Sequence, residues 1–290
     1  MIDYVQLKVL GYDARSLIDH PLLVFQDYHD CDSHEVYGVA ESTYKGLRFR
    51  VTPSNQLYVD GSLHKFHNAG LHNHDRFTYP DVLETFNRLE NEFGVNANNC
   101  VIENLEFGVN LRNLDGSVDD ILNGLLTFKN QRFSDRKYKH GSYKFASFNH
   151  YEIKAYDKGT QNALDEPVMR YEVKYKRSQK LRGIAPDCKT LADVVEPTNF
   201  KSISNHLTST WNDVLLYDTS INSTDADFLR RCHGHYWESA SNWSSGAEKS
   251  KHHRERKKFK QTLNDQSNLH QNIGNAIRAE TERFYPIYSA

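Results

Sequence analysis

The sequence predicts an α+β fold, with a largely antiparallel sheet that carries helices on one face, leaves a polar face open, and is followed by a helical region. Three observations lead to this prediction. Several segments within the first 185 residues alternate between apolar and polar side chains, which is the period of a half-buried strand. Two other segments in the same part of the chain have apolar residues at helical spacing. Beyond Gly183 the alternation stops and helical spacing continues.

Four of the expected strands lie before residue 112, at 2–9, 44–51, 56–66 and 101–111. Each places apolar side chains on one side and polar side chains on the other, because successive residues of a strand point to opposite faces. A sheet whose strands are apolar on one side only is typically antiparallel and covered by helices on that side.

Two helices are expected to provide this cover, at 78–93 and from Ser117 to about residue 129. The first has Pro80 in its first turn and is followed by Gly94, which is the usual asymmetry of helix ends. The second begins with Ser117 three residues before Asp120, as in a capping box.

The stretch from Phe148 to Arg177 predicts two more strands, which are adjacent in the sheet and separated by a break at Gly159–Pro167. Tyr156 lies on the polar side of the first strand, and Lys158 follows it. A phenol among cations and carboxylates suits an enzyme that attacks phosphate with tyrosine, because a nearby cation favours the phenolate. We therefore expect catalytic roles for Tyr156 and Lys158. The basic side chains of this face are candidate DNA contacts: Lys154, Arg170, Lys174 and Lys176.

Beyond Gly183, apolar spacing predicts helices over 189–196, 199–217, 225–238, 248–264 and 268–284, with Ser239–Gly246 as a linker. We predict two domains, residues 1–184 around the sheet and an accessory helical region at 185–290. One of these helices, at 248–264, carries a run of Lys and Arg that is either a solvated face or a set of phosphate contacts. The second reading makes DNA-binding residues of Arg254, Lys257 and Lys258.

The overall charge weighs against a strongly basic nucleic-acid-binding domain, since 36 Lys and Arg stand against 38 Asp and Glu for a net charge of −2. The basic residues are unevenly distributed, however, and crowd into 129–158, 170–182 and 249–260. An uneven surface can bind a polyanion on one side. Four scattered cysteines without a CxxC pair favour reduced thiols. The sequence contains no apolar run of about 18 residues, so we predict no membrane span.

Four segments in this order, GSLHKFHNAGLHNHDRF, NLEFGVNL, YEIKAYDKG and MRYEVKYKRSQKLRGI, resemble the phage and plasmid replication initiators typified by the filamentous-phage gene II protein. That gene II/X-like family is related to the HUH endonucleases, and the resemblance covers most of residues 1–185. It implies that Tyr156, in AYDK, nicks one DNA strand and becomes attached to its 5′ phosphate. It also implies that 1–184 is the nicking domain and 185–290 an accessory DNA-binding region.

The resemblance further implies a divalent cofactor, Mg²⁺ or Mn²⁺. It assigns a metal or catalytic role to Glu106 in NLEF and to His72 in LHN. By strand alternation His64 and Glu172 join them on the polar side, so both are candidate ligands, although Glu172 among cations is equally a salt-bridge partner. The sequence departs from the usual His-hydrophobe-His pair, because two residues separate His64 from the next histidine and polar Asn73 follows His72.

The function that follows is a rolling-circle replication initiator, a metal-dependent, single-tyrosine enzyme that nicks and closes DNA at an origin. Its expected partners are single-stranded or supercoiled origin DNA and a host helicase, and its expected location is the bacterial cytoplasm, away from membranes. Two alternatives remain. A mobilisation relaxase or transposase would use the same chemistry, and an origin-binding or regulatory protein would bind DNA without cutting it.

Overall fold

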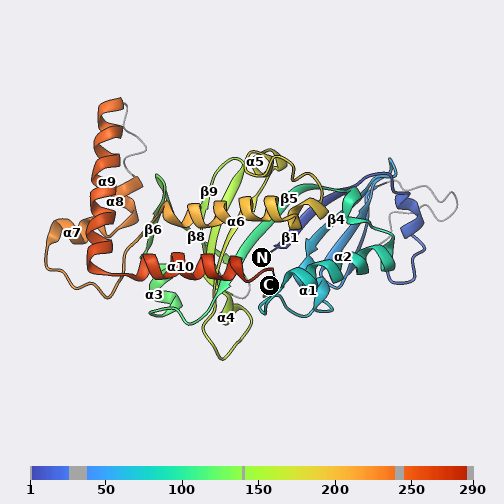
Figure 1. Ribbon diagram of the computed structural model, residues 1–290, viewed down its shortest axis with the longest axis horizontal. Coiled ribbons are helices and arrows are strands. Elements are labelled where there is room, and N and C mark those ends of the chain that lie inside the picture. The colour runs from blue at the N-terminus through green and yellow to red at the C-terminus, as the bar shows by residue number, and fades with distance from the viewer. Residues whose placement is uncertain (1, 26–37, 139–140, 239–244, 286–290) are drawn as a thin grey trace, which may run out of the picture. The chain divides into compact units, whose positions relative to one another are not determined.

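The computed structural model describes residues 2–25, 38–138, 141–238 and 245–285, and its strands form two sheets (Figure 1). The larger sheet has nine strands in the order β2-β3-β4-β1-β5-β11-β10-β9-β8, and the smaller has the order β12-β6-β7. The strands of the larger sheet are β1 (Ile2–Val9), β2 (Ala40–Tyr44), β3 (Leu47–Val51), β4 (Leu57–Ser62), β5 (Cys100–Leu111), β8 (Ser134–Tyr138), β9 (Gly141–Ser147), β10 (Tyr151–Asp157) and β11 (Met169–Tyr175). This large antiparallel sheet with its helices confirms the predicted α+β class.

The chain divides into two compact units, each built from separate stretches of sequence. The first unit comprises Met1–Gly108, Lys174–Ser204 and Arg283–Ala290, and the second comprises Val109–Val173 and Asn205–Glu282. Both units contain sheet and helix. The functional division at residue 184 is a separate matter and stays a prediction.

In the first unit, α2 (Tyr79–Phe93) packs against the apolar side of the hairpin strands, where Phe93 and Phe49 have ring centroids 4.6 Å apart. The expected helix ends are confirmed. Thr78 and Asp81 form a capping box, and Gly94 ends the helix in the left-handed region with φ 67°. Further short elements of this unit are α1 (Leu63–His67), α5 (Ser178–Arg182) and the 3₁₀ turns η1 (Ala14–Leu17), η2 (Ala97–Asn99) and η3 (Ala192–Val195).

Two strand predictions in the first unit need correction. The strand expected over 44–51 is β3 and begins only at Leu47, because Tyr44 ends β2 and the hairpin turns at Lys45 and Gly46, both at positive φ. The strand expected over 56–66 ends at Ser62, whose hydroxyl accepts a hydrogen bond from the Lys65 amide at 3.1 Å and caps α1. His64 therefore lies on a helix, and its expected place on the polar side of a strand was wrong.

In the second unit, β10 and β11 confirm the expected pair of adjacent strands. Their apolar side is covered by α6 (Pro197–Asn212), because Tyr171 on β11 packs edge-on against Trp211 at 5.1 Å between ring centroids. The Tyr171 hydroxyl also lies 3.0 Å from the Thr210 hydroxyl. The hairpin of β8 and β9, which extends this part of the sheet, was not expected from the sequence.

Two expected helices end early in the second unit because their last residues join the small sheet. The helix predicted from Ser117 is α3 (Val118–Gly124), and it is followed by β6 (Leu125–Phe128). The helix predicted over 199–217 ends at Asn212 and gives way to β12 (Val214–Leu216), which pairs with β6. Buried backbone pairing between these apolar segments outweighs their helical spacing. The third strand of this sheet is β7 (Gln131–Arg132).

The remaining helices of the second unit are α4 (Lys158–Gln161), α7 (Ala226–Arg231), α8 (Gly234–Glu238), α9 (Gly246–Gln266) and α10 (Leu269–Glu282). Phe259 and Leu263 of α9 join a hydrophobic cluster with Trp237 of α8 and Phe228 of α7. Of the predicted linker, residues 239–244 lie outside the described residues, as does Cys31. Within the described residues, Cys100, Cys188 and Cys232 are buried free thiols, and no helix is long and apolar enough to span a membrane.

Candidate functional site

Tyr156 lies near the end of β10, on the side of the strand opposite the core. Its neighbours Ile153 and Ala155 are fully buried on the apolar side, and Tyr156 pairs in register with Tyr143 of β9. The two tyrosine ring centroids are 6.5 Å apart. The side expected from alternation is thus the observed one, but Tyr156 is only 9% exposed, so neighbouring side chains cover most of it.

Lys158 is the cation beside this phenol. Its Nζ lies 5.7 Å from the centroid of the Tyr156 ring and donates to Gln161 Oε1 at 3.1 Å. The side chain is 3% exposed and stands at the start of α4, where Asp157 caps the helix. Its position follows from the sequence, because a strand that ends at Asp157 turns immediately into a helix.

A second group of charges follows the same side of β10 and β11 in the second unit. Glu172 accepts from Arg170 Nε at 2.5 Å and from Lys154 Nζ at 3.2 Å. Arg170 also donates to Asn110 Oδ1 at 3.0 Å. Glu172 and Arg170 are each about 1% exposed, so this is a buried ion-pair network. The salt-bridge alternative for Glu172 is the arrangement observed.

Glu106 lies on β5 in the first unit, where it pairs with Lys174 Nζ at 2.8 Å. Lys174 in turn stands over the ring of Tyr4, 4.9 Å from its centroid. Next to them, Asp60 accepts hydrogen bonds from Arg48, Arg50 and the Tyr4 hydroxyl. Burial, followed by the charge of Asp60, raises the pKa of Tyr4. Lys176 directly follows the end of β11 and is half-buried.

The predicted histidine ligands meet at one carboxylate. His64 Nε2 lies 2.6 Å from Asp75 Oδ1, and His72 Nδ1 lies 3.4 Å from the same oxygen. Burial opposes ionisation of Asp75, but the charge of His64 and a hydrogen bond from Asn68 outweigh it and lower the pKa of Asp75. His64 stacks on Phe77 at 4.6 Å, so this cluster belongs to the loop around α1.

A divalent metal ion has no ready-made site among these side chains. In the parts of the chain that the structure describes, no three or more His, Cys, Asp or Glu residues form a group that could hold one. Glu106 and Glu172 are each engaged by a cation, His64 hydrogen-bonds Asp75, and His72 hydrogen-bonds Asn68. The carboxylates and imidazoles are of the right chemical type to bind Mg²⁺ or Mn²⁺, but they do not gather around one position.

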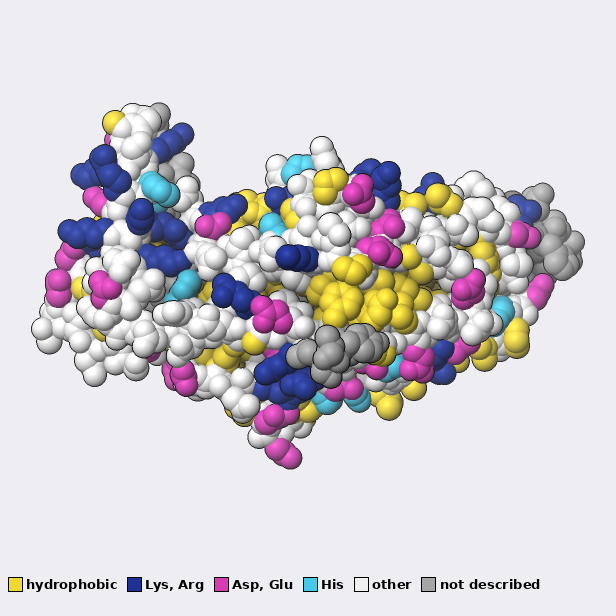
Figure 2. All heavy atoms as spheres, viewed as in Figure 1, with side chains coloured by type: hydrophobic (Ala, Val, Ile, Leu, Met, Phe, Trp, Pro, Cys, Tyr) yellow, Lys and Arg dark blue, Asp and Glu magenta, His cyan; other side chains and the backbone are white. Residues whose placement is uncertain are grey.

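The three predicted DNA contacts on α9 are exposed. Arg254, Lys257 and Lys258 point away from the hydrophobic cluster to which Phe259 and Leu263 belong. Figure 2 shows Lys and Arg side chains gathered along this helix. A face of this kind supplies contacts to phosphates without reading bases.

Sequence reasoning missed the contribution of the β8–β9 hairpin. Tyr143 receives a hydrogen bond from Arg136 at 3.0 Å, and Lys154 Nζ lies 5.9 Å from the Tyr143 ring centroid. Because the Tyr143 ring lies beside that of Tyr156, Tyr143 and its hydrogen-bond donor Arg136 belong to the surroundings of Tyr156. The signal that could have found them is the alternation on either side of His140 and Gly141, which is weak because both faces of this hairpin are polar.

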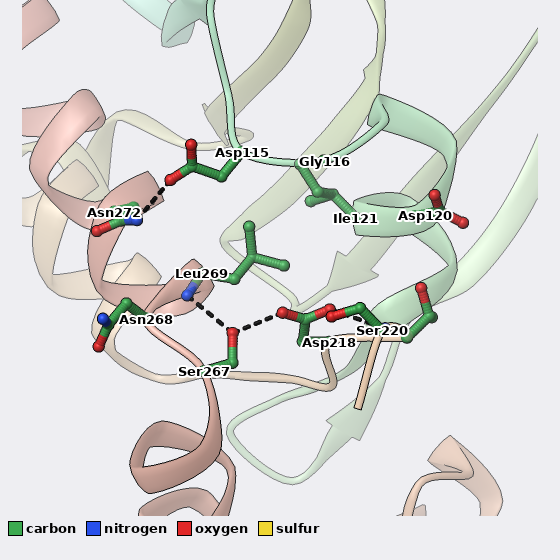
Figure 3. A pocket seen from close by; sticks show the side chains of 11 residues that line it. Asp115, Gly116, Asp120, Ile121, Asp218, Ser220, Ser267, Asn268, Leu269 and Asn272 are labelled. Carbon is green, nitrogen blue, oxygen red and sulfur yellow. Dashed lines mark hydrogen bonds between the residues drawn. The ribbon is translucent and has the colours of Figure 1, made fainter. Parts of the chain in front are cut away.

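A cavity of 350 Å³ lies elsewhere in the second unit, between α3 and the start of α10 (Figure 3). Its lining includes Asp115 and Asp218, which accept hydrogen bonds from Asn272 at 2.6 Å and from Ser267 at 2.5 Å. Burial opposes the ionised form of Asp218, but hydrogen bonds from Ser267 and Ser220 lower its pKa. None of the residues predicted for the site lines this cavity.

Comparison with known proteins finds similarity at the level of structure. No family model matches the sequence, and no curated protein matches it. Among solved structures, the chain is similar to a rolling circle replication initiator protein from Geobacillus stearothermophilus, with a TM-score of 0.42 and 14% identity over 78% of this chain and 89% of that one.

Proposed function

We propose that the protein is a replication initiator of a phage or plasmid that nicks one DNA strand at an origin through Tyr156. The observation that carries this proposal is the placement of a tyrosine on the polar side of the sheet with the Nζ of Lys158 5.7 Å from its ring centroid. The buried ion-pair network of Lys154, Arg170 and Glu172 supports it, since it fixes β10 and β11 on the side that carries Tyr156.

The chemistry is a transesterification. Tyr156 Oη loses its proton to solvent and forms a bond to the scissile phosphorus, while the bond from phosphorus to the 3′ oxygen breaks and that oxygen takes up a proton. The positive charge of Lys158 favours the ionised attacking oxygen. Because the phosphotyrosine keeps the energy of the broken bond, a later 3′-hydroxyl can reverse the step and close the strand.

The proposal includes Mg²⁺ or Mn²⁺, which would polarise the scissile phosphate. Glu106, Glu172, His64 and His72 are the candidate ligands, but their side chains do not form a complete site by themselves. We therefore assign no step to the metal. Removal of divalent ions by a chelator, with recovery on addition of Mn²⁺, tests the requirement.

The test is incubation of the full chain with supercoiled plasmid carrying a candidate origin and Mn²⁺, followed by electrophoresis in detergent. We expect a nicked product with protein attached to its 5′ end. Tyr156→Phe should abolish the adduct and leave DNA binding unchanged. A wild-type amount of adduct in this variant would remove Tyr156 as nucleophile.

Tyr143→Phe is the matched control, because Tyr143 faces Tyr156 across two paired strands. It removes one hydroxyl from the same surface, so it should retain the adduct. Loss of the adduct in Tyr143→Phe alone would assign the nucleophile to the neighbouring strand.

A second candidate function is an origin-binding or regulatory protein without nuclease activity. The low exposure of Tyr156 and the ion pairs of both candidate carboxylates favour it. Retarded migration of origin DNA without any nick, at saturating protein and Mn²⁺, would establish this alternative. A relaxase or transposase would instead form the adduct on a transfer origin or a transposon end.

A further inference from the structure

A polar pocket of 430 Å³ lies between α6, α9 and α10, and all the residues that line it belong to the second unit. Its lining combines the cations Lys260 and Arg278 with the amides of Asn264, Gln271 and Asn275. Pockets of this volume are large enough for a small ligand. The pocket is separate from Tyr156, and none of the residues assigned above to DNA binding lines it.

Lys260 is a half-buried cation whose charge the protein compensates only in part. Its Nζ donates to the backbone carbonyl of Asn212, and it forms no ion pair with a carboxylate in the described part of the chain. Burial, followed by the nearby charge of Arg256, lowers the pKa of Lys260 to about 8. The negative charge of Asp213 opposes part of this decrease. An anion placed beside this amine would recover the electrostatic energy that burial removes.

Arg278 supplies a second cation from the opposite helix. Its side chain is exposed, lines the pocket, and is likewise without an ion pair among the described residues. A guanidinium and an ammonium that converge with several amide donors make a set of N–H groups with one charge sign, which matches phosphate oxygens.

The pocket lies at the end of a row of basic side chains along α9. Lys249, His253, Arg256 and Lys260 are spaced by four, three and four residues, so they follow one side of the helix. We call this row the α9 stripe. A negatively charged polymer that follows the stripe reaches Lys260 and the pocket at its end.

We propose that the pocket binds a phosphate group of a nucleotide through Lys260 and Arg278, and that a DNA strand lying along the α9 stripe presents this phosphate. Asn264, Gln271 and Asn275 donate further hydrogen bonds to the phosphate or to the attached base. The part that concerns DNA rests on the proposed function, whereas the phosphate site itself does not.

The first experiment measures fluorescence anisotropy of a labelled, 5′-phosphorylated single-stranded oligonucleotide of about 16 nucleotides against the full chain at several salt concentrations. Lys260→Met and Arg278→Gln should each raise Kd about tenfold and reduce the dependence of log K on log salt by about one unit. Lys201→Gln removes an exposed cation of α6 outside the pocket and should leave both unchanged. Wild-type affinity and salt dependence in both pocket variants would overturn the part of the proposal that places a DNA strand at the pocket.

The second experiment distinguishes a strand from a free nucleotide by titrating the chain with thymidine monophosphate. Trp211 reports on the pocket, because its ring stacks on His270, which lines it. A weak saturable change in tryptophan fluorescence, lost in Arg278→Gln, supports the phosphate site. The same change with oligonucleotide binding unaffected by either variant would refute presentation by a strand.

Tyr156→Phe separates the proposal of nicking from the proposal of a phosphate site. It should bind the oligonucleotide and thymidine monophosphate like the wild type, because Tyr156 is not part of the pocket. The nicking proposal can thus fail while the phosphate site stands, and the phosphate site can fail while nicking is observed.

Discussion

Lys154 Nζ lies 3.2 Å from Glu172 Oε1, and this ion pair joins β10 to β11 on the side of the strands that carries Tyr156. The side chain of Glu172 is 2% exposed and that of Lys154 is 13% exposed. Arg170 completes the group from the same strand as Glu172. A buried carboxylate held by two cations fixes the local positions of strands and side chains more firmly than a solvated pair does.

Glu172→Gln should lower the free energy of unfolding by about 3 to 5 kcal/mol, because it leaves the buried guanidinium of Arg170 without its carboxylate. Urea unfolding followed by circular dichroism measures this loss. The control is Asp135→Asn, which breaks the more exposed pair between Lys144 and Asp135 and should cost less than about 1 kcal/mol. Equal effects of the two substitutions would show that burial does not govern the Glu172 network.

Lys158→Met should reduce the rate of nicking about 10- to 100-fold with little change in DNA affinity. The reason is that the methionine keeps the aliphatic packing next to Tyr156 but removes the charge, together with the hydrogen bond to Gln161. Single-turnover adduct formation at saturating protein measures the rate, and anisotropy measures the affinity. Lys158→Arg should recover part of the rate. A Lys158→Met enzyme with the wild-type rate would leave Lys158 as a packing residue.

Replacing Arg254, Lys257 and Lys258 together by glutamine should weaken DNA binding to a similar extent for unrelated sequences. Each lost phosphate contact should also reduce the slope of log K against log salt by about one unit. These side chains are exposed on α9, so the stability of the protein should stay within about 0.5 kcal/mol of the wild type. Loss of binding to one sequence only would instead indicate that these residues read bases.

Acid should destabilise the second unit through His270. Burial, followed by the charge of Lys260, lowers the pKa of His270 to about 4 from its ordinary 6.5. Between pH 4 and pH 6.5 the unfolded chain therefore binds more protons than the folded chain. The contribution of the neutral His270 ring to the free energy of unfolding is fully present above pH 6.5 and is lost as pH falls toward 4. The loss is on the order of 3 kcal/mol.

Urea unfolding at pH 7 and pH 5 tests this prediction in the wild type and in His270→Gln. The variant lacks the titrating ring, so its stability should fall less between the two pH values. Carboxylates whose pKa is lowered, such as Asp218, contribute little in this window and affect both proteins equally. The same pH dependence in both proteins would show that folding does not lower the pKa of His270.

Much of the fold could be predicted from local pattern. The alternation around Tyr156 and the signals of Pro80 and Gly94 gave the correct strand and helix, because each depends on neighbours within a few residues. The early ends of the helices before Leu125 and Val214 could not be predicted, since these two segments pair with each other across a long stretch of chain. The pairing of Glu172 with Lys154 on the neighbouring strand and the pocket around Lys260 depend in the same way on segments separated in sequence.

The sequence by itself determined the α+β class, the side of β10 on which Tyr156 stands and the basic character of α9, because periodicity and composition are properties of short stretches. Only the tertiary structure decided that Glu172 is paired with two cations, that His64 lies on a helix beside Asp75, and that Lys260 and Arg278 line one pocket. Burial and charge pairing arise when distant segments meet, and strand alternation carries no information on which partners they bring.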